Sequence, residues 1–202
     1  MSAARRHNMA VFLKKYGSEL ASAINNQPIF FVAMWAQACN ESGYGSSSAA
    51  KNKNNFFGIL SGNTTRRFNT ANDAFSYQVE LLKNPNLPYV AAGVLNANSP
   101  YAQIRSIADG GYYSMTNDST LATNYHGNGD IPKGWVWNGY TWTGSKWGGS
   151  NFTTKQSADH YYNVVKGFID DGLAVLPLGK VNASGLAQVQ SNISNINVNA
   201  VV

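Results

Sequence analysis

Residues 28–50 read Pro-Ile-Phe-Phe-Val-Ala-Met-Trp-Ala-Gln-Ala-Cys-Asn-Glu-Ser-Gly-Tyr-Gly-Ser-Ser-Ser-Ala-Ala, and this stretch decides the fold. Apolar side chains occupy nearly every position as far as Cys39, which predicts a helix buried on all sides. Pro28 suits the first turn of that helix, and Gly43 follows its end. The helix carries Glu41 to its C-terminal end, where the helix dipole is unfavourable to a carboxylate.

Further helices are expected on both sides of this core segment, from apolar spacing and from capping residues. Thr70 and Asp73 form a capping box, and Gly172 suits the end of the last helix. Residues 56–69 are expected to form a short strand pair or an irregular lobe. The expected helices cover 8–25, 28–42, a segment that begins after Thr70, 88–96, 100–108 and 154–170. The sequence therefore predicts a predominantly α-helical α+β protein.

The composition favours a surface that forms hydrogen bonds rather than ion pairs. The chain has 202 residues, of which 44% are hydrophobic and only 12% are charged. The surface is therefore expected to be rich in Asn, Ser, Thr, Gly and Tyr, which suits a sugar ligand. The net charge of +5 favours an anionic partner such as a cell-wall polymer. The basic residue pairs lie far apart in the sequence, so nucleic-acid binding is not expected.

Several other classes of site are excluded by simple counts. Cys39 is the one cysteine, so no intrachain disulfide is possible, and it is expected to be a buried structural thiol. His7, His126 and His160 share no ligand spacing, and we expect no metal and no cofactor. No apolar run approaches the ~18 residues of a membrane span, and we expect no secretory signal peptide.

An aromatic segment near residue 140 predicts a β-hairpin. Asn138-Gly139 is a strong signal for a two-residue turn between strands. That turn would pair Trp137 with Tyr140, Val136 with Thr141 and Trp135 with Trp142. Strand alternation would then place four aromatic rings on one face. Such a face can stack on sugar rings, bind a protein partner or pack on its own domain, and the sequence leaves these three uses open.

Glu41 is the residue best placed for catalysis. It ends a buried helix, and a Gly-rich turn and an aromatic loop follow it. Desolvation raises the pKa of a carboxyl group, and a glycosidase acid must stay protonated near neutral pH to protonate the leaving oxygen. The alternative is that Glu41 only caps the chain where the helix ends.

The spacing of the whole stretch resembles the glucosaminidase domain of glycoside hydrolase family 73. That family reads roughly Q-A-x-x-E-S-G-W-G-x-S-x-x-A and then N-N-x-F-G-I, which residues 37–50 and 54–59 follow closely. Further segments of this chain are similar to the family at 68–82, 111–114 and 160–169. In all, the resemblance covers about residues 10–125 and 154–170.

The resemblance implies a lysozyme-like fold with a cleft, a small β-lobe and the aromatic hairpin as an insertion. It also implies cleavage of the β-1,4 bond after N-acetylglucosamine in peptidoglycan. Carried over to this chain, Glu41 would be the general acid and Tyr112 would line the reacting sugar. The candidate substrate-binding residues are Tyr44, Asn55, Phe57, Tyr113, Trp135 and Trp137.

One departure from the family bears on the mechanism. Many relatives carry a second acidic residue on the β-lobe, whereas residues 61–67 here contain no carboxylate. A glycosidase without it can use the 2-acetamido oxygen of its own substrate to attack the anomeric carbon. Tyr112 could then orient the acetamide through its hydroxyl. Asp73 is expected to serve as a helix cap, and Glu80 to lie on a solvated face.

The domain expected to be catalytic covers residues 1–172, with an insertion at about 126–152. Residues 173–202 are expected to form a flexible tail or, less favoured, an edge strand.

The main interpretation is a peptidoglycan N-acetylglucosaminidase acting as a type VI secretion effector or a phage endolysin. Two alternatives stay open: a muramidase or lytic transglycosylase of similar fold, and a non-catalytic peptidoglycan-binding module.

The expected partners are glycan strands and, for an effector, a cognate immunity protein that occludes the cleft. The chain is otherwise expected to be a monomer. We expect synthesis in the cytoplasm and action in the periplasm or cell wall, after export by a route without a signal peptide.

Overall fold

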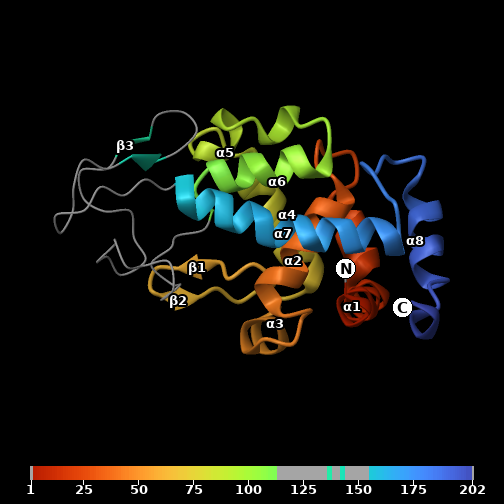
Figure 1. The fold of residues 1–202 in the computed structure, drawn as a ribbon. Coiled ribbons are helices and arrows are strands. Elements are labelled where there is room, and N and C mark those ends of the chain that lie inside the picture. Colours follow the sequence, from red (N-terminus) through yellow and green to blue (C-terminus); the bar gives the residue numbers. More distant parts are fainter. Residues whose placement is uncertain (1, 113–135, 138–141, 144–154, 202) are drawn as a thin grey trace.

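Helix α2 (Phe31–Ser42) lies at the centre of the computed structural model, which describes residues 2–112, 136–137, 142–143 and 155–201 (Figure 1). Every side chain from Phe31 to Cys39 is buried, which confirms the buried helix predicted from its apolar run. The helix begins at Phe31 rather than at Pro28. It ends at Ser42 and is followed by Gly43, whose φ of 55° is a left-handed conformation that favours glycine.

The remaining helices surround α2. Helices α1, α6 and α7 pack directly on it, while α4 and α8 pack on α1. The capping box of Thr70 and Asp73 is present at the start of α4, as predicted. The helices are α1 (Ala3–Ala23), α3 (Ser48–Lys53), α4 (Ala71–Lys83), α5 (Pro88–Ala91), α6 (Pro100–Asp109), α7 (Lys155–Val175) and α8 (Leu186–Ser194), with 3₁₀ turns η1 (Val94–Asn96) and η4 (Val198–Ala200).

A small antiparallel strand pair projects from one end of the helical body (Figure 1). Strand β1 (Leu60–Ser61) pairs with β2 (Thr64–Thr65), with Leu60 opposite Thr65 and Ser61 opposite Thr64. The strand pair expected within residues 56–69 is therefore confirmed. The fold is the predominantly helical, lysozyme-like α+β fold that the sequence predicts.

Asn55 holds the base of this strand pair. Its buried amide donates to the carbonyls of Ile59 and Arg66, at 2.8 and 2.9 Å, and accepts from the amides of Phe57 and Ile59. These bonds satisfy main-chain groups on both sides of the β-lobe. The side chain therefore fixes the loop that carries Phe57.

Replacing Asn55 with Ala is expected to lower the free energy of unfolding by about 2 kcal/mol, because it leaves main-chain groups of the loop without partners. Thermal unfolding followed by circular dichroism would measure this as a fall in Tm of roughly 4–8 °C. Asn52→Ala is the matched control, since the Asn52 amide donates only to the exposed Ser48 hydroxyl. Equal Tm values for the two variants would contradict this role of Asn55.

The aromatic hairpin has a different register from the one predicted. Strand β3 (Val136–Trp137) pairs with β4 (Trp142–Thr143), with Val136 opposite Thr143 and Trp137 opposite Trp142. The predicted pairing of Trp137 with Tyr140 is therefore wrong. Residues 138–141, on which the predicted two-residue turn falls, lie outside the described residues. Longer hairpin connections compete with the two-residue turn, and the dipeptide alone does not choose between them.

The C-terminal region corrects two further expectations. Helix α7 does not stop at Gly172 but continues to Val175. A Cβ at position 172 would lie 3.0 Å from Val32 Cγ2, so glycine there permits the close approach of α7 to α2.

The expected flexible tail or edge strand is wrong for residues 173–201. Val189 and Ile193 of α8 are buried against the core, and α8 packs on α1. Phe30 and Lys180 form an isolated β-bridge that joins this region to the start of α2. In the described part of the chain, no helix combines the length and the apolar character needed to cross a membrane.

Candidate active site

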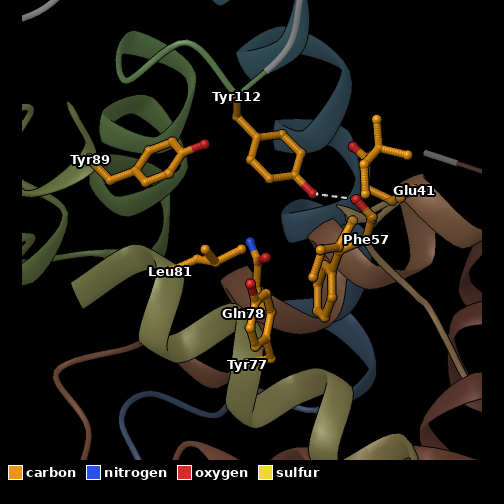
Figure 2. A pocket seen from close by; sticks show the side chains of 10 residues that line it. Glu41, Phe57, Tyr77, Gln78, Leu81, Tyr89 and Tyr112 are labelled. Atoms are coloured by element: carbon orange, nitrogen blue, oxygen red, sulfur yellow. Dashed lines mark hydrogen bonds between the residues drawn. The ribbon is translucent and has the colours of Figure 1, made fainter. Parts of the chain in front are cut away.

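A cavity of about 620 Å³ opens between α2, α4, the loop before β1 and the end of α6 (Figure 2). Its walls combine aromatic rings with a small number of polar groups, which is the composition of a ligand site. The lining residues are Glu41, Phe57, Gly58, Ile59, Leu60, Tyr77, Gln78, Leu81, Tyr89 and Tyr112.

Glu41 supplies the only carboxylate among the described residues that line this cavity. Burial raises the pKa of the Glu41 carboxyl group, and hydrogen bonds with Tyr161 and with Asn40 partly oppose that rise. The Asn40 amide donates to Glu41 Oε1 at 3.1 Å. A half-buried carboxyl group whose pKa is raised is suited to donate a proton near neutral pH.

A chain of buried hydrogen bonds joins three helices behind the cavity wall. Gln78 Nε2 on α4 donates to Gln37 Oε1 on α2 at 3.2 Å. Gln37 Nε2 in turn donates to the Tyr161 hydroxyl on α7 at 3.1 Å. The two Gln residues and Tyr161 are all buried, so water does not compete for these bonds.

Tyr112 lies between Tyr89 and Glu41 in the cavity wall (Figure 2). Its hydroxyl donates to the main-chain carbonyl of Phe57 at 2.7 Å. Burial, and next the nearby charge of Glu41, raise the pKa of the Tyr112 hydroxyl well above its ordinary value. The group is therefore a neutral hydrogen-bond donor, and without substrate its proton is directed at Phe57.

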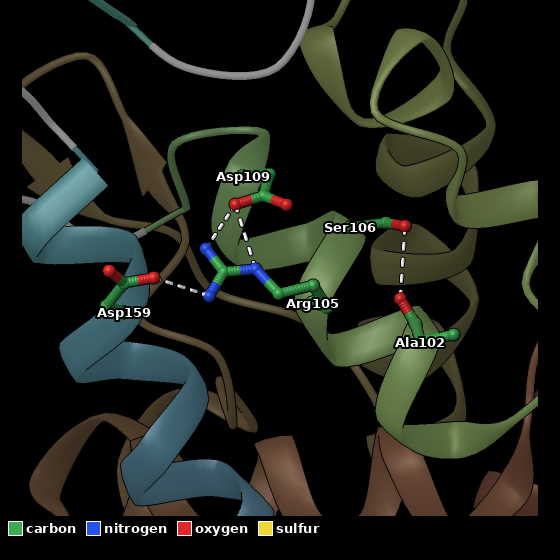
Figure 3. Close-up of polar contacts among 5 residues, drawn as sticks. All are labelled: Ala102, Arg105, Ser106, Asp109 and Asp159. Atoms are coloured by element: carbon green, nitrogen blue, oxygen red, sulfur yellow. Dashed lines mark hydrogen bonds and ion pairs between the residues drawn. The ribbon is translucent and has the colours of Figure 1, made fainter.

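An ion-pair cluster fixes the helices that carry these tyrosines (Figure 3). Arg105 on α6 pairs with Asp109 one turn further along and with Asp159 on α7, the latter at 2.8 Å. Tyr112 follows the end of α6, and Tyr161 lies two residues after Asp159. The cluster therefore joins the chain segments on which both tyrosines lie, and their rings pack 5.4 Å apart.

The predicted site residues fall into four groups. Glu41, Tyr112 and Phe57 line the cavity together. The Asn55 side chain supports the cavity floor from behind. Tyr44 lies elsewhere: it packs on Phe168 and lines a separate cavity of about 260 Å³ beside α1. Tyr113 and Trp135 lie outside the described residues, and Trp137 is described only as part of strand β3.

The sequence analysis did not identify Tyr77, Gln78, Leu81, Tyr89 or Tyr161 as site residues. Gln37 carried a usable signal, because it is the one polar side chain in the apolar run from Phe31 to Cys39, one turn before Glu41. Gln78 carried the same signal on α4, where it is flanked by apolar positions. The expectations for Cys39, Asp73 and Glu80 are confirmed: a buried thiol, a helix cap and an exposed side chain paired with Lys83.

Arg66 contacts the cavity wall through Tyr77. Arg66 donates to the Tyr77 hydroxyl at 2.8 Å, and its guanidinium lies 4.2 Å from the centre of that ring. Tyr77 forms part of the cavity wall. In the described ranges no group of three or more His, Cys, Asp or Glu side chains is arranged to hold a metal ion.

Comparison with known proteins gives one match. A family model described as mannosyl-glycoprotein endo-beta-N-acetylglucosaminidase matches residues 17–171, which include every residue that lines the cavity. The searches of curated proteins and of solved structures gave no match.

Proposed function

The chain belongs to the glucosaminidase family, glycoside hydrolase family 73, and from this premise we propose that it cleaves the β-1,4 bond after N-acetylglucosamine in peptidoglycan, with Glu41 as general acid. The observation that carries the assignment of Glu41 is its position in the cavity wall with a pKa raised by burial. The net charge of +5 also favours an anionic wall polymer.

In the proposed reaction, the protonated Glu41 carboxyl gives its proton to the glycosidic oxygen as the bond to the anomeric carbon breaks. The acetamido oxygen of the same sugar attacks that carbon and forms a cyclic oxazolinium ion. Water then opens the ring, and its proton returns to the Glu41 carboxylate. This route fits a cavity in which Glu41 is the one carboxylate among the described lining residues.

Tyr112 is the proposed donor to the acetamide. In the substrate complex, the Tyr112 hydroxyl would donate to the acetamide instead of to the Phe57 carbonyl. That bond would restrain the acetamide while the acetamide oxygen attacks the anomeric carbon. Replacing Tyr112 with Phe is expected to lower kcat by about tenfold to a hundredfold, because one preorganised donor is lost. Release of reducing ends from purified peptidoglycan would measure the change.

Tyr101→Phe is the matched control for that variant, because the Tyr101 hydroxyl donates to Asp170 and Tyr101 is not part of the cavity lining. It is expected to keep full activity. Full activity in Tyr112→Phe as well would remove Tyr112 from the mechanism.

The bond specificity is tested by product analysis. Purified peptidoglycan would be digested, reduced with borohydride and analysed by mass spectrometry. New reducing ends on N-acetylglucosamine support the proposal. Reducing ends on N-acetylmuramic acid would indicate a muramidase, and anhydro ends a transglycosylase. Binding to peptidoglycan without any product would indicate a binding module.

The proposed substrate lies outside the cytoplasm, so we infer that the enzyme acts in the periplasm or cell wall, as a bacteriolytic effector or a phage endolysin. Expression directed to the periplasm is expected to lyse the host, whereas expression retained in the cytoplasm is not. A neighbouring gene for a small secreted inhibitor would favour the effector, and neighbouring holin genes the endolysin. Equal growth under both kinds of expression would contradict this inference.

A further inference from the structure

We propose that Arg66 binds a carboxylate of the substrate and makes the enzyme prefer acidic peptidoglycan strands to uncharged ones. This inference rests on the proposed function, because it concerns the substrate of the same cavity. N-acetylglucosamine is uncharged. The N-acetylmuramic acid on either side of it carries a lactyl group, which ends in a free carboxylate or in a peptide with carboxylates of its own. A strand with N-acetylglucosamine beside Glu41 therefore brings an anionic group to the neighbouring sugar position.

The main chain of Arg66 is held in the β-lobe beside the cavity. Its amide donates to the Ile59 carbonyl at 2.9 Å, and its own carbonyl accepts from the Asn55 side chain at 2.9 Å. Ile59 is one of the residues that line the cavity. The Arg66 side chain therefore starts from a fixed point next to the cavity wall.

Two aromatic rings hold the Arg66 guanidinium in place. Its central carbon lies 4.2 Å from the centre of the Tyr77 ring and 5.7 Å from that of Phe68, and the group donates to the Tyr77 hydroxyl at 2.8 Å. Tyr77 is on α4 and lines the cavity (Figure 2). The faces of aromatic rings attract a cation without neutralising its charge. The guanidinium is therefore preorganised at the cavity wall and remains a full positive charge.

No carboxylate neutralises Arg66 in the described part of the chain. Arg5 and Arg105 each pair with an aspartate, whereas the one polar side-chain partner of Arg66 among the described residues is the Tyr77 hydroxyl. Residues 42–72 contain no Asp or Glu. The Arg66 side chain is half-buried, and its other N–H groups are not enclosed. A guanidinium has five N–H donors in a fork that matches a carboxylate, so Arg66 keeps donors for a ligand.

The test measures binding of soluble glycan strands to the Glu41→Gln variant, so that cleavage does not interfere. Isothermal titration calorimetry would compare strands that have free carboxylates with strands whose carboxylates have been converted to amides. We expect the acidic strands to bind about tenfold more tightly, and this preference to shrink as the salt concentration rises. Adding Arg66→Gln is expected to remove the preference and to leave the affinity for amidated strands within about twofold.

Arg67→Gln is the matched control, because it removes the same charge from the next residue. The Arg67 side chain is exposed and donates to the Asn52 carbonyl at 2.6 Å, and this variant should keep the preference. Arg66→Lys should keep part of it, because the charge remains and the fork is lost. The inference is overturned if Glu41→Gln shows no preference, if Arg66→Gln retains it, or if the Lys and Gln variants lose it equally.

Strands stripped of their peptides by an amidase identify the carboxylate. A preference that persists for stripped strands over their amidated form assigns Arg66 to the lactyl carboxylate. A preference seen only with the peptides attached assigns it to a peptide carboxylate.

The binding test is independent of the proposed reaction. If the wild type releases no glycan products, the proposed function fails, while the carboxylate preference still decides the role of Arg66. In an active enzyme, Arg66→Gln is expected to lower kcat/KM for acidic strands about tenfold and to change kcat by less than about twofold, because Arg66 contacts the substrate away from the reacting atoms. An unchanged kcat/KM for acidic strands would contradict the inference.

Discussion

Replacing Glu41 with Gln is expected to lower the release of glycan fragments from peptidoglycan by about a thousandfold. The amide has the shape of the carboxyl group but no proton to give to the glycosidic oxygen. Binding of the insoluble substrate should be kept, since the aromatic walls of the cavity are unchanged. A sedimentation assay would measure binding, and mass spectrometry of reduced products would measure cleavage.

The same variant has an expected signature in stability. Burial raises the pKa of Glu41 in the folded protein above its value in the unfolded chain. The stability that protonated Glu41 contributes is fully present below the pKa that Glu41 has in the unfolded chain. It is lost as the pH rises through the pKa that Glu41 has in the folded protein. Gln cannot ionise, so Tm of the variant should equal or exceed that of the wild type at neutral pH. A lower Tm would mean that Glu41 is a structural residue.

Replacing Arg5 with Met is expected to lower the free energy of unfolding by about 3 kcal/mol. Arg5 on α1 forms an ion pair with Asp171 on α7, and the Asp171 side chain is fully buried. Arg6 is the more distant partner of the same carboxylate, with its Nε 3.9 Å from the other oxygen. Met keeps much of the apolar stem of Arg5. The fall in the free energy of unfolding therefore reports mainly on the buried Asp171 carboxylate, which loses its nearest cation. Chemical denaturation would measure it.

Two controls separate this effect from surface electrostatics. Lys166→Met removes the exposed partner of Asp170 and should change the free energy of unfolding much less than Arg5→Met does, because solvent screens an exposed ion pair. The double variant Arg5→Met, Asp171→Asn should be more stable than Arg5→Met alone, because it no longer buries an unpaired charge. A double variant less stable than Arg5→Met would show that the buried charge is not the source of the loss.

Much of the fold could be predicted because its signals are local. The apolar run of α2 and the capping box at Thr70 each lie within one turn or one helix, and the structure confirms them. The hairpin register and the path of the chain after Gly172 could not be predicted in this way. The path after Gly172 depends on packing partners far away in the sequence, such as Val32 against Gly172 and α1 against α8. The hairpin register depends on which of several possible connections forms, and the Asn-Gly dipeptide does not choose between them.

The same division holds for the site. The sequence by itself determined that Glu41 ends a buried helix and is followed by the loop of Phe57, because a motif of fixed spacing carries them. Only the tertiary structure decided that Tyr112 directs its proton at Phe57, and that hydrogen bonds join Gln78, Gln37 and Tyr161 behind the cavity. The positions of these residues in the sequence do not reveal the contacts. Each hydrogen bond needs two groups within about 3 Å of each other, and the packing of separate chain segments brings them together.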